Sequence, residues 1–183
     1  ELLGRGGQGA VYAVKGGRLA VKLVMGRGQR HRERIRNQLA HVRRLSLAEL
    51  SLAKPLEMLR PPHTGYVMEL LTDMVPIKSL FTPPKGQMPS VDWYLESGGL
   101  RRRLLVLARA AHVLAQLHGK GIAYSDPSPA NIFVSRDVDF CEVWFIDTDN
   151  LRYESSPGTL DGMYTPGYGA PELVRGESGI TTL

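Results

Sequence analysis

The loop at residues 124–131 constrains this chain more than any other stretch. It reads Tyr-Ser-Asp-Pro-Ser-Pro-Ala-Asn, so Asp126 is followed five positions later by Asn131 in a segment restricted by two prolines. An apolar run at 143–146 then leads to a second aspartate, Asp147. Asp126 could accept a proton, and oxygens of Asn131 and Asp147 are the hard ligands that Mg²⁺ prefers. The pattern predicts a site that holds a divalent metal and a hydroxyl beside a phosphate.

Length and composition restrict the class of protein. With 183 residues, the chain suits one domain or two small lobes. Its hydrophobic content of 43% and charged content of 22% are ordinary for a globular protein. The single cysteine, Cys141, excludes an intramolecular disulfide framework and favours a reducing, cytoplasmic location. No run of about 18 apolar residues is present, so no membrane segment is expected in this chain. No signal peptide is visible, and the chain is expected to begin inside a domain.

The net charge of +5 has two interpretations. It could reflect affinity for an anion, but a solvated basic surface is the commoner reason. The most basic stretch, residues 29–46, predicts a helix because apolar residues recur at helical spacing. No aromatic residues are interleaved for stacking on bases, so we expect a solvated helix face and no specific nucleic-acid binding. The apolar positions are Ile35, Leu39, Val42 and Leu45.

A glycine-rich stretch opens the chain. Residues 4–12 contain the pattern G-x-G-x-x-G-x-V, in which glycines let backbone N–H groups approach phosphate oxygens. A dinucleotide-binding fold needs a helix directly after the glycines. Here residues 10–14 and 19–24 both resemble strands joined at a Gly-Gly turn. The pattern therefore predicts a β-hairpin lid. Lys22 lies in its second strand, where it could reach phosphates or simply point to solvent by alternation.

Hydrophobic periodicity and turn residues predict the secondary structure of the remaining segments. Residues 56–59 and 65–71 predict two strands, and 72–98 predict a linker with short helical pieces. Residues 99–118 predict a buried scaffold helix, with Arg101, Arg102 and Arg103 covering its exposed start. A hairpin is expected around Arg136-Asp137, and a long loop over 147–172. The apolar stripe of the helix comprises Leu100, Leu104, Leu107, Ala108, Ala111, Leu114 and Leu117.

Taken in order, these motifs resemble those of the protein-kinase family over nearly the whole chain. The order is the glycine loop, Ala20-Val21-Lys22, Val67-Met68-Glu69, a long helix, Asp126-x-x-x-x-Asn131, Asp147 and Ala170-Pro171-Glu172. The resemblance implies an α+β, two-lobed fold of the bacterial serine/threonine type. Residues 1–71 would form a small β-rich lobe and residues 72–183 a helical lobe. The family carries further helices after Ala-Pro-Glu, so we expect the large lobe to be incomplete here.

The resemblance also implies an ATP site. The glycines would cover the phosphates, and Lys22 would bind the α- and β-phosphates. The adenine would be enclosed by apolar side chains and bonded at its edge by the backbone from Glu69 to Leu71. The residues given these roles are Gly4, Gly6 and Gly9 over the phosphates, Val11 and Ala20 around the base, Met68 behind it and Phe133 beneath it.

For catalysis, the resemblance makes Asp126 the base that orients the substrate hydroxyl, while Asn131 and Asp147 bind Mg²⁺. Residues 165–169, before Ala-Pro-Glu, would receive a peptide substrate. The partners implied are therefore ATP, Mg²⁺ and a protein bearing a Ser or Thr hydroxyl. Such a site contributes mainly positioning and charge neutralisation.

Several positions depart from the family pattern. Tyr124-Ser125 replaces the usual His-Arg, which removes the arginine that would bind an activation-loop phosphate. We therefore expect activity to be independent of such phosphorylation. Ser128 replaces a lysine near the transferred phosphate. The usual Asp-Phe-Gly triplet is Asp147-Thr148-Asp149, which adds a carboxylate and removes an apolar anchor.

The carboxylate partner of Lys22 is an open question in the sequence. Glu33 is the sole acid in the 29–46 stretch, and at about 100° per residue it falls opposite the apolar positions. Gln38 has the better helical phase but no charge. Either Lys22 pairs with Glu33 in a shifted helix, or that ion pair is absent.

Two other functions stay open beside a protein kinase. A small-molecule phosphotransferase of the aminoglycoside or choline kinase type shares the Asp-x-x-x-x-Asn motif and the metal aspartate, but usually lacks Ala-Pro-Glu. A pseudokinase, which would bind nucleotide or act as a scaffold without turnover, is favoured by the degenerate motifs. The intact Lys22, Asp126, Asn131 and Asp147 oppose the pseudokinase.

Overall fold

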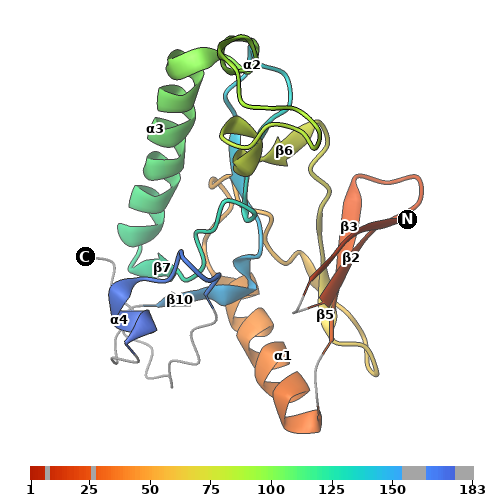
Figure 1. The fold of residues 1–183 in the computed structure, drawn as a ribbon. Helices are drawn as coiled ribbons and strands as arrows, with labels where there is room; N and C mark the ends of the chain where they lie inside the picture. The colour runs from red at the N-terminus through yellow and green to blue at the C-terminus, as the bar shows by residue number, and fades with distance from the viewer. Residues whose placement is uncertain (7–8, 26–27, 154–163, 176–183) are drawn as a thin grey trace. The chain divides into compact units, whose positions relative to one another are not determined.

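The computed structural model describes residues 1–6, 9–25, 28–153 and 164–175, as the ribbon in Figure 1 shows. The architecture is α+β. The chain divides into two compact units. Unit 1 comprises residues 1–72 together with 147–149, and unit 2 comprises residues 73–146 together with the chain from residue 150 onward. The segment 147–149 therefore belongs to the N-terminal unit although it lies late in the sequence.

Unit 1 is built on a five-stranded sheet with the order β1-β2-β3-β5-β4. All neighbouring strands are antiparallel. The predicted hairpin is present as β2 and β3, and the glycine stretch contributes a further strand, β1, that was not foreseen. The strands are β1 (Leu2–Gly6), β2 (Gly9–Ala13), β3 (Leu19–Val24), β4 (Glu57–Met58) and β5 (Gly65–Glu69).

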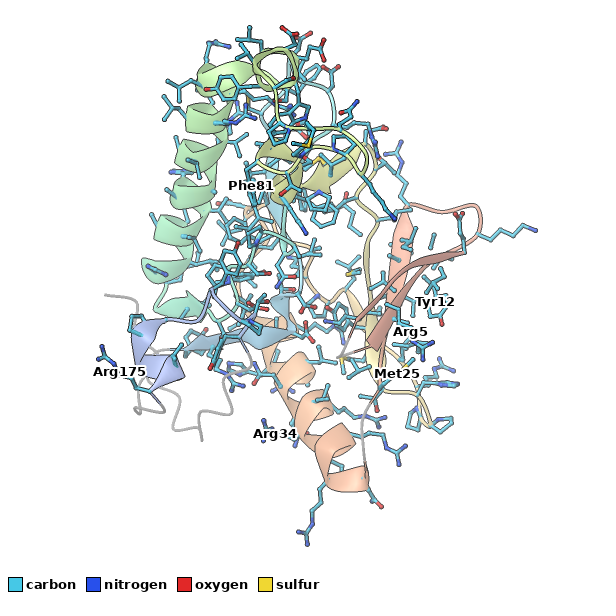
Figure 2. The ribbon with its side chains drawn as sticks, viewed as in Figure 1. Arg5, Tyr12, Met25, Arg34, Phe81 and Arg175 are labelled. Carbon is cyan, nitrogen blue, oxygen red and sulfur yellow. The ribbon has the colours of Figure 1, made fainter. Side chains whose placement is uncertain are left out.

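The register of this sheet gathers the predicted nucleotide residues on one face. Val11 on β2 and Tyr66 on β5 both lie opposite Lys22 on β3. Ala20 lies opposite Met68. Residues directly opposite in an antiparallel pair project from the same face, and so do residues two apart on one strand. Tyr12 projects from the other face and is partly exposed (Figure 2).

Helix α1 (Gln29–Arg44) occupies the predicted basic stretch and lies beside β4 and β5. Leu39 and Val42 are buried, as the periodicity predicted. The arginines lie on the remaining faces, and Figure 2 shows Arg34 projecting from the helix. Arg43 forms a surface ion pair with Glu57 at 2.8 Å. Such an exposed pair contributes at most about 1 kcal/mol.

Unit 2 contains two small antiparallel sheets, β6-β8-β9 and β10-β7, and the long helix α3. The hairpin expected around Arg136-Asp137 is formed by β8 and β9. The elements are β6 (Met74–Pro76), η1 (Ile77–Leu80), α2 (Val91–Glu96), α3 (Gly99–His118), β7 (Ile122–Tyr124), β8 (Ile132–Ser135), β9 (Val143–Phe145), β10 (Leu151–Tyr153) and α4 (Pro171–Val174), with the 3-10 turn η2 (Thr148–Asn150) before β10.

The expectation of a loop over 147–172 was wrong at its start. Strand β10 lies inside that range and pairs with β7, with Leu151 opposite Tyr124. Leu151 is fully buried, so the strand is held by an apolar side chain in the core as well as by its pairing with β7. The part of the predicted loop at 154–163 lies outside the described residues.

Helix α3 was predicted correctly in extent, and Leu117 is buried as predicted, but most of the predicted apolar stripe is exposed. It packs on β7 and β9 through a narrow line of residues that includes Val106, Ala110, Val113 and Leu117. Leu104 and Leu107, which the sequence placed in the buried stripe, are 56% and 58% exposed. The helix rests on short strands, so only the line facing them is covered among the described residues.

The arginines at the start of α3 also differ from expectation. Arg102 is 5% exposed and does not cover the surface. Its guanidinium donates to the carbonyl oxygens of Ser97, Ser135 and Asp137, and so holds the end of β8 against the helix. Arg103 is half-buried and lies 4.4 Å from the ring centroid of Tyr94. Buried guanidinium groups need such acceptors because an unpaired one is costly.

No helix among the described residues is both long enough and apolar enough to cross a membrane.

Gly65 is a structural requirement of unit 1. A Cβ at this position would lie 2.0 Å from the carbonyl oxygen of Lys22, and its φ is +153°. We expect Gly65→Ala to lower the free energy of unfolding by about 2 kcal/mol or more, because β5 must move away from β3. Gly17→Ala is the matched control, since its Cβ would meet nothing closer than 3.9 Å. Urea unfolding of both variants measures the difference, and equal midpoints would contradict this prediction.

Candidate functional site

Lys22 is the centre of a buried charge cluster in unit 1. It is 5% exposed, and its ammonium contacts Oδ1 of Asp147. It also contacts both carboxylate oxygens of Asp149, at 2.9 Å and 3.1 Å. The hydroxyl of Tyr66 donates to Oδ1 of Asp149 at 3.3 Å, and the Tyr66 ring centroid lies 5.9 Å from the ammonium. One lysine is therefore held by two carboxylates and an aromatic ring.

A hydrogen bond anchors the segment that carries the two aspartates. Thr148 is completely buried, and its hydroxyl donates to the carbonyl oxygen of Ala53 at 2.9 Å. The sequence suggested that this triplet had lost its apolar anchor, and here a polar anchor stands in that place. Asp147 has a φ of 59°, in the left-handed region that non-glycine residues seldom adopt. Aspartate is among the residues that adopt this region most readily, and Asp73 does so too, with a φ of 54°.

The electrostatics of the cluster are unbalanced. Burial alone would lower the pKa of Lys22, but Asp149 and Asp147 outweigh it, so the pKa of Lys22 is raised. Burial, and then repulsion by Asp149, raise the pKa of Asp147, although Lys22 opposes both. With both carboxylates ionised, the cluster carries one more negative than positive charge. A further cation beside it would relieve that repulsion.

The structure answers the question of the lysine's partner. Glu33 is exposed, and its carboxylate accepts a hydrogen bond from the side-chain amide of Gln29 at 2.9 Å. The carboxylates that contact Lys22 are those of Asp147 and Asp149. Of the two possibilities left by the sequence, the absence of a Lys22–Glu33 pair is the one that holds among the described residues.

Asp126 is the centre of a second cluster, in unit 2. It is 8% exposed. The side-chain amide of Asn131 donates to its Oδ2 at 3.0 Å and to its backbone carbonyl at 3.1 Å. Thr165 donates twice, from its backbone N–H to Oδ1 and from its hydroxyl to Oδ2, both at 3.0 Å. The carboxylate is thereby fixed in one orientation by three donors.

The loop that carries Asp126 runs between β7 and β8. Its turn is closed by backbone bonds from Ser128 to Asp126 and from Asn131 to Ser128. The hydroxyl of Tyr124 donates to the carbonyl oxygen of Ile146, and its ring packs edge-on against Phe145 at 5.1 Å. Tyr124, which stands where the family has histidine, thus ties the loop to the end of β9.

The donor chemistry of these residues fits magnesium. Both bonds from Asn131 to Asp126 use the amide nitrogen, so the amide oxygen takes no part in them. The contact with Lys22 uses Oδ1 of Asp147 and leaves Oδ2 outside that ion pair. Nowhere in the described ranges do three or more His, Cys, Asp or Glu side chains form a metal cluster. Magnesium suits such a sparse set because it usually keeps waters and takes phosphate oxygens as ligands.

The remaining predicted residues are distributed between the units. Gly4 and Gly6 lie on β1, and a Cβ at either would meet no atom within 4 Å. Gly9 is different, because a Cβ there would lie 2.0 Å from the carbonyl oxygen of Leu23. On β3 and β5, Ala20 and Met68 are buried. The other four are Val11 and Leu71, half-buried in unit 1, Glu69, exposed in unit 1, and Phe133, half-buried on β8 in unit 2.

Sequence reasoning missed three residues of these clusters. Asp149 was noticed as an extra carboxylate but given no role, and Thr165 was placed only in the peptide-binding segment. Tyr66 was assigned no role, although strand alternation puts it on the same face as Met68, two residues later. That alternation was the available signal for Tyr66. Nothing local signals the contacts of Asp149 and Thr165, because both join distant parts of the sequence.

No protein-family model matches the chain. The serine/threonine-protein kinase Pkn1 of Myxococcus xanthus is 30% identical over 194 residues, which cover 99% of this chain and 26% of that kinase. The chain thus spans about a quarter of the length of the curated relative that it matches. This similarity supports a kinase-like relationship and, in general terms, phosphotransfer chemistry. The sheet and helix of unit 1 are compatible with the small lobe of a kinase.

The hydroxyl of Thr148 provides a test of how segment 147–149 is held. Thr148→Val keeps the shape but leaves the buried carbonyl of Ala53 without this donor. We expect the free energy of unfolding to fall by about 1–3 kcal/mol. Thr72→Val, at an exposed position in the same unit, should change it by less than about 0.5 kcal/mol. Urea unfolding measures both, and equal stabilities for the two variants would contradict the anchoring role.

Proposed function

We propose that this chain binds ATP and Mg²⁺ and transfers the terminal phosphoryl group to Ser or Thr hydroxyls of a protein. The observation that carries the proposal is the buried contact between Lys22 and Asp147, which lie 125 positions apart in the sequence. The motifs assign one to the nucleotide phosphates and the other to the metal. The similarity to a bacterial serine/threonine kinase over 99% of the chain supports the same chemistry.

In this proposal, unit 1 supplies the nucleotide site. Lys22 binds the α- and β-phosphates, and the strands that carry Gly4, Gly6 and Gly9 cover them. The base lies on the face formed by Val11, Ala20 and Met68. The Leu70 N–H is committed to the carbonyl of Arg18, so the base edge is bonded by backbone groups of Glu69 and Leu71. The family resemblance also assigns Phe133, on β8, to the adenine base.

Asp126 acts on the substrate hydroxyl. Its carboxylate accepts the hydroxyl proton as the oxygen attacks the phosphorus atom. Asn131 and Thr165 hold the carboxylate in orientation, which is a contribution of positioning. Asn131 and Asp147 would hold the magnesium, which when bound neutralises charge on the phosphates. Lys22 is the phosphate-binding cation in this proposal. Because Ser128 replaces a lysine, less positive charge surrounds the transferred phosphoryl group than in the family pattern.

A protein substrate is favoured over a small alcohol. Thr165 begins the segment 165–169 that resembles the peptide-receiving segment of protein kinases, and it is bonded to Asp126. The Ala170-Pro171-Glu172 motif follows directly, at the start of α4. We further propose that residues 1–71 and 72–183 correspond to the small lobe and part of the large lobe. Activity should not depend on activation-loop phosphorylation, since serine replaces the usual arginine at 125.

Asp126→Asn tests the proposed chemistry. We expect turnover of ATP with magnesium and a protein substrate to fall by about 10²- to 10⁴-fold, because the proton acceptor is removed. ATP affinity should stay within about twofold, since Asp126 does not contact the nucleotide in the proposal. Asp139→Asn, an exposed aspartate of the same unit, is the matched control and should behave as wild type. Radiolabel transfer and isothermal titration calorimetry provide the two measurements.

The same assay separates the alternatives. Transfer to aminoglycosides or choline but not to proteins would replace the protein substrate with a small molecule. ATP binding without any turnover that depends on Asp126 would identify a pseudokinase. Failure to bind ATP would overturn the nucleotide site altogether.

A further inference from the structure

We propose that Asp149 is the residue that positions Lys22 for the nucleotide phosphates, in place of any acid on helix α1. This assignment rests on the proposed function and adds to it a positioning residue outside the motif set. Lys22 is 5% exposed, and a buried ammonium is costly unless a carboxylate compensates it. The question is therefore which carboxylate can hold the lysine while ATP and metal are bound.

Asp149 makes the more extensive contact with Lys22. Both of its carboxylate oxygens lie within 3.1 Å of the ammonium, whereas Asp147 uses one oxygen. Asp149 is also the more deeply buried, with its side chain 11% exposed against 20% for Asp147. A two-oxygen contact in a water-poor site restricts the ammonium more than a one-oxygen contact does.

Asp149 is itself held from two directions. The hydroxyl of Tyr66 donates to its Oδ1 at 3.3 Å. The residue before it, Thr148, is anchored to the carbonyl of Ala53. Tyr66 lies directly opposite Lys22 in the sheet, so its ring and hydroxyl contact the lysine and the aspartate together. Asp149 is therefore supported as a rigid partner independently of the ion pair.

Helix α1 offers no competing carboxylate. Glu33 is its sole acid, is exposed, and accepts a hydrogen bond from Gln29. The position of the lysine is therefore set by the three-residue segment 147–149 and not by that helix.

The two aspartates then have separate tasks. Asp147 is the proposed magnesium ligand, and a carboxylate that coordinates metal is less available to hold a lysine. Asp149 can keep the ammonium in place when Asp147 turns to the metal. The extra carboxylate of the Asp-Thr-Asp triplet thus compensates for the acid that α1 lacks.

The affinity ratio of ATP to adenosine tests this assignment without metal or turnover. Adenosine keeps the base and the ribose but lacks the phosphates that Lys22 binds, so its affinity does not depend on the phosphate contacts. Calorimetry in EDTA would compare wild type with Asp149→Asn and with Glu33→Gln. We expect Asp149→Asn to bind ATP about tenfold more weakly, with adenosine affinity unchanged, because the lysine is no longer oriented. Glu33→Gln should match wild type for both ligands.

Different results would contradict the assignment of Asp149 and the proposed function. If Asp149 acted only through its charge, Asp149→Asn would bind ATP more tightly, because a negative group near the phosphates is removed. An unchanged or raised ratio of ATP affinity to adenosine affinity in Asp149→Asn would overturn the assignment. A loss of ATP affinity in Glu33→Gln would overturn it too. Absence of ATP binding by the unaltered protein would overturn the proposed function and this inference together.

Tyr66→Phe keeps the test decisive if Asp149→Asn does not fold. This variant removes just the hydroxyl that donates to Asp149 and leaves the ring beside Lys22. We expect a smaller loss, about threefold, in ATP affinity with no change for adenosine. In that case an unchanged ratio in Tyr66→Phe would overturn the assignment of Asp149.

Discussion

The buried ammonium of Lys22 is the constraint on which unit 1 depends. A charge that is 5% exposed must be compensated, and on the lysine's face of the sheet β5 supplies the aromatic ring of Tyr66, while its acid, Glu69, lies on the opposite face. The acids come from residues 147–149, which brings a late segment of the chain into the N-terminal unit. The close approach of β5 to β3 at Gly65 and the bond from Thr148 to Ala53 both serve this arrangement. Sheet, segment and charge cluster therefore belong to one compact unit.

Local pattern was sufficient for much of the fold. Alternation and turns predicted the β2–β3 hairpin, and helical spacing predicted α1 and α3 within a few residues. Periodicity did not predict burial where the buried face of a helix is decided by the strands that pack against it. The leucines of α3 have correct helical spacing, yet the helix buries the line through Val106 and Ala110, because β7 and β9 face that line. Arg102 lies on the buried line for the same reason, and carbonyl acceptors at the end of β8 make its burial tolerable.

In the candidate site, the sequence predicted the positions of the charged residues but not the groups that contact them. The positions of Lys22, Asp126, Asn131 and Asp147 could be read from motif order, because each stands at a fixed distance from glycines, prolines or strand ends. Which groups contact them could not be read. The partner of Lys22 was sought on α1 by helical phase, but ion pairing is decided by tertiary contact. Asp149 and Thr165 gain their roles from residues 127 and 39 positions away, respectively.

The two clusters are built by different physical means. Lys22 is fixed by charge, with two carboxylates around one ammonium, so its geometry responds to any added anion or cation. Asp126 is fixed by neutral donors, namely an amide, a hydroxyl and a backbone N–H, which orient the carboxylate without cancelling its charge. These donors fix where the carboxylate oxygens lie, which is the contribution of positioning that the proposed role of Asp126 requires. Ser128, which stands where the kinase motif has a lysine, adds no charged group to this second cluster, so hydrogen bonds and not ion pairs define it.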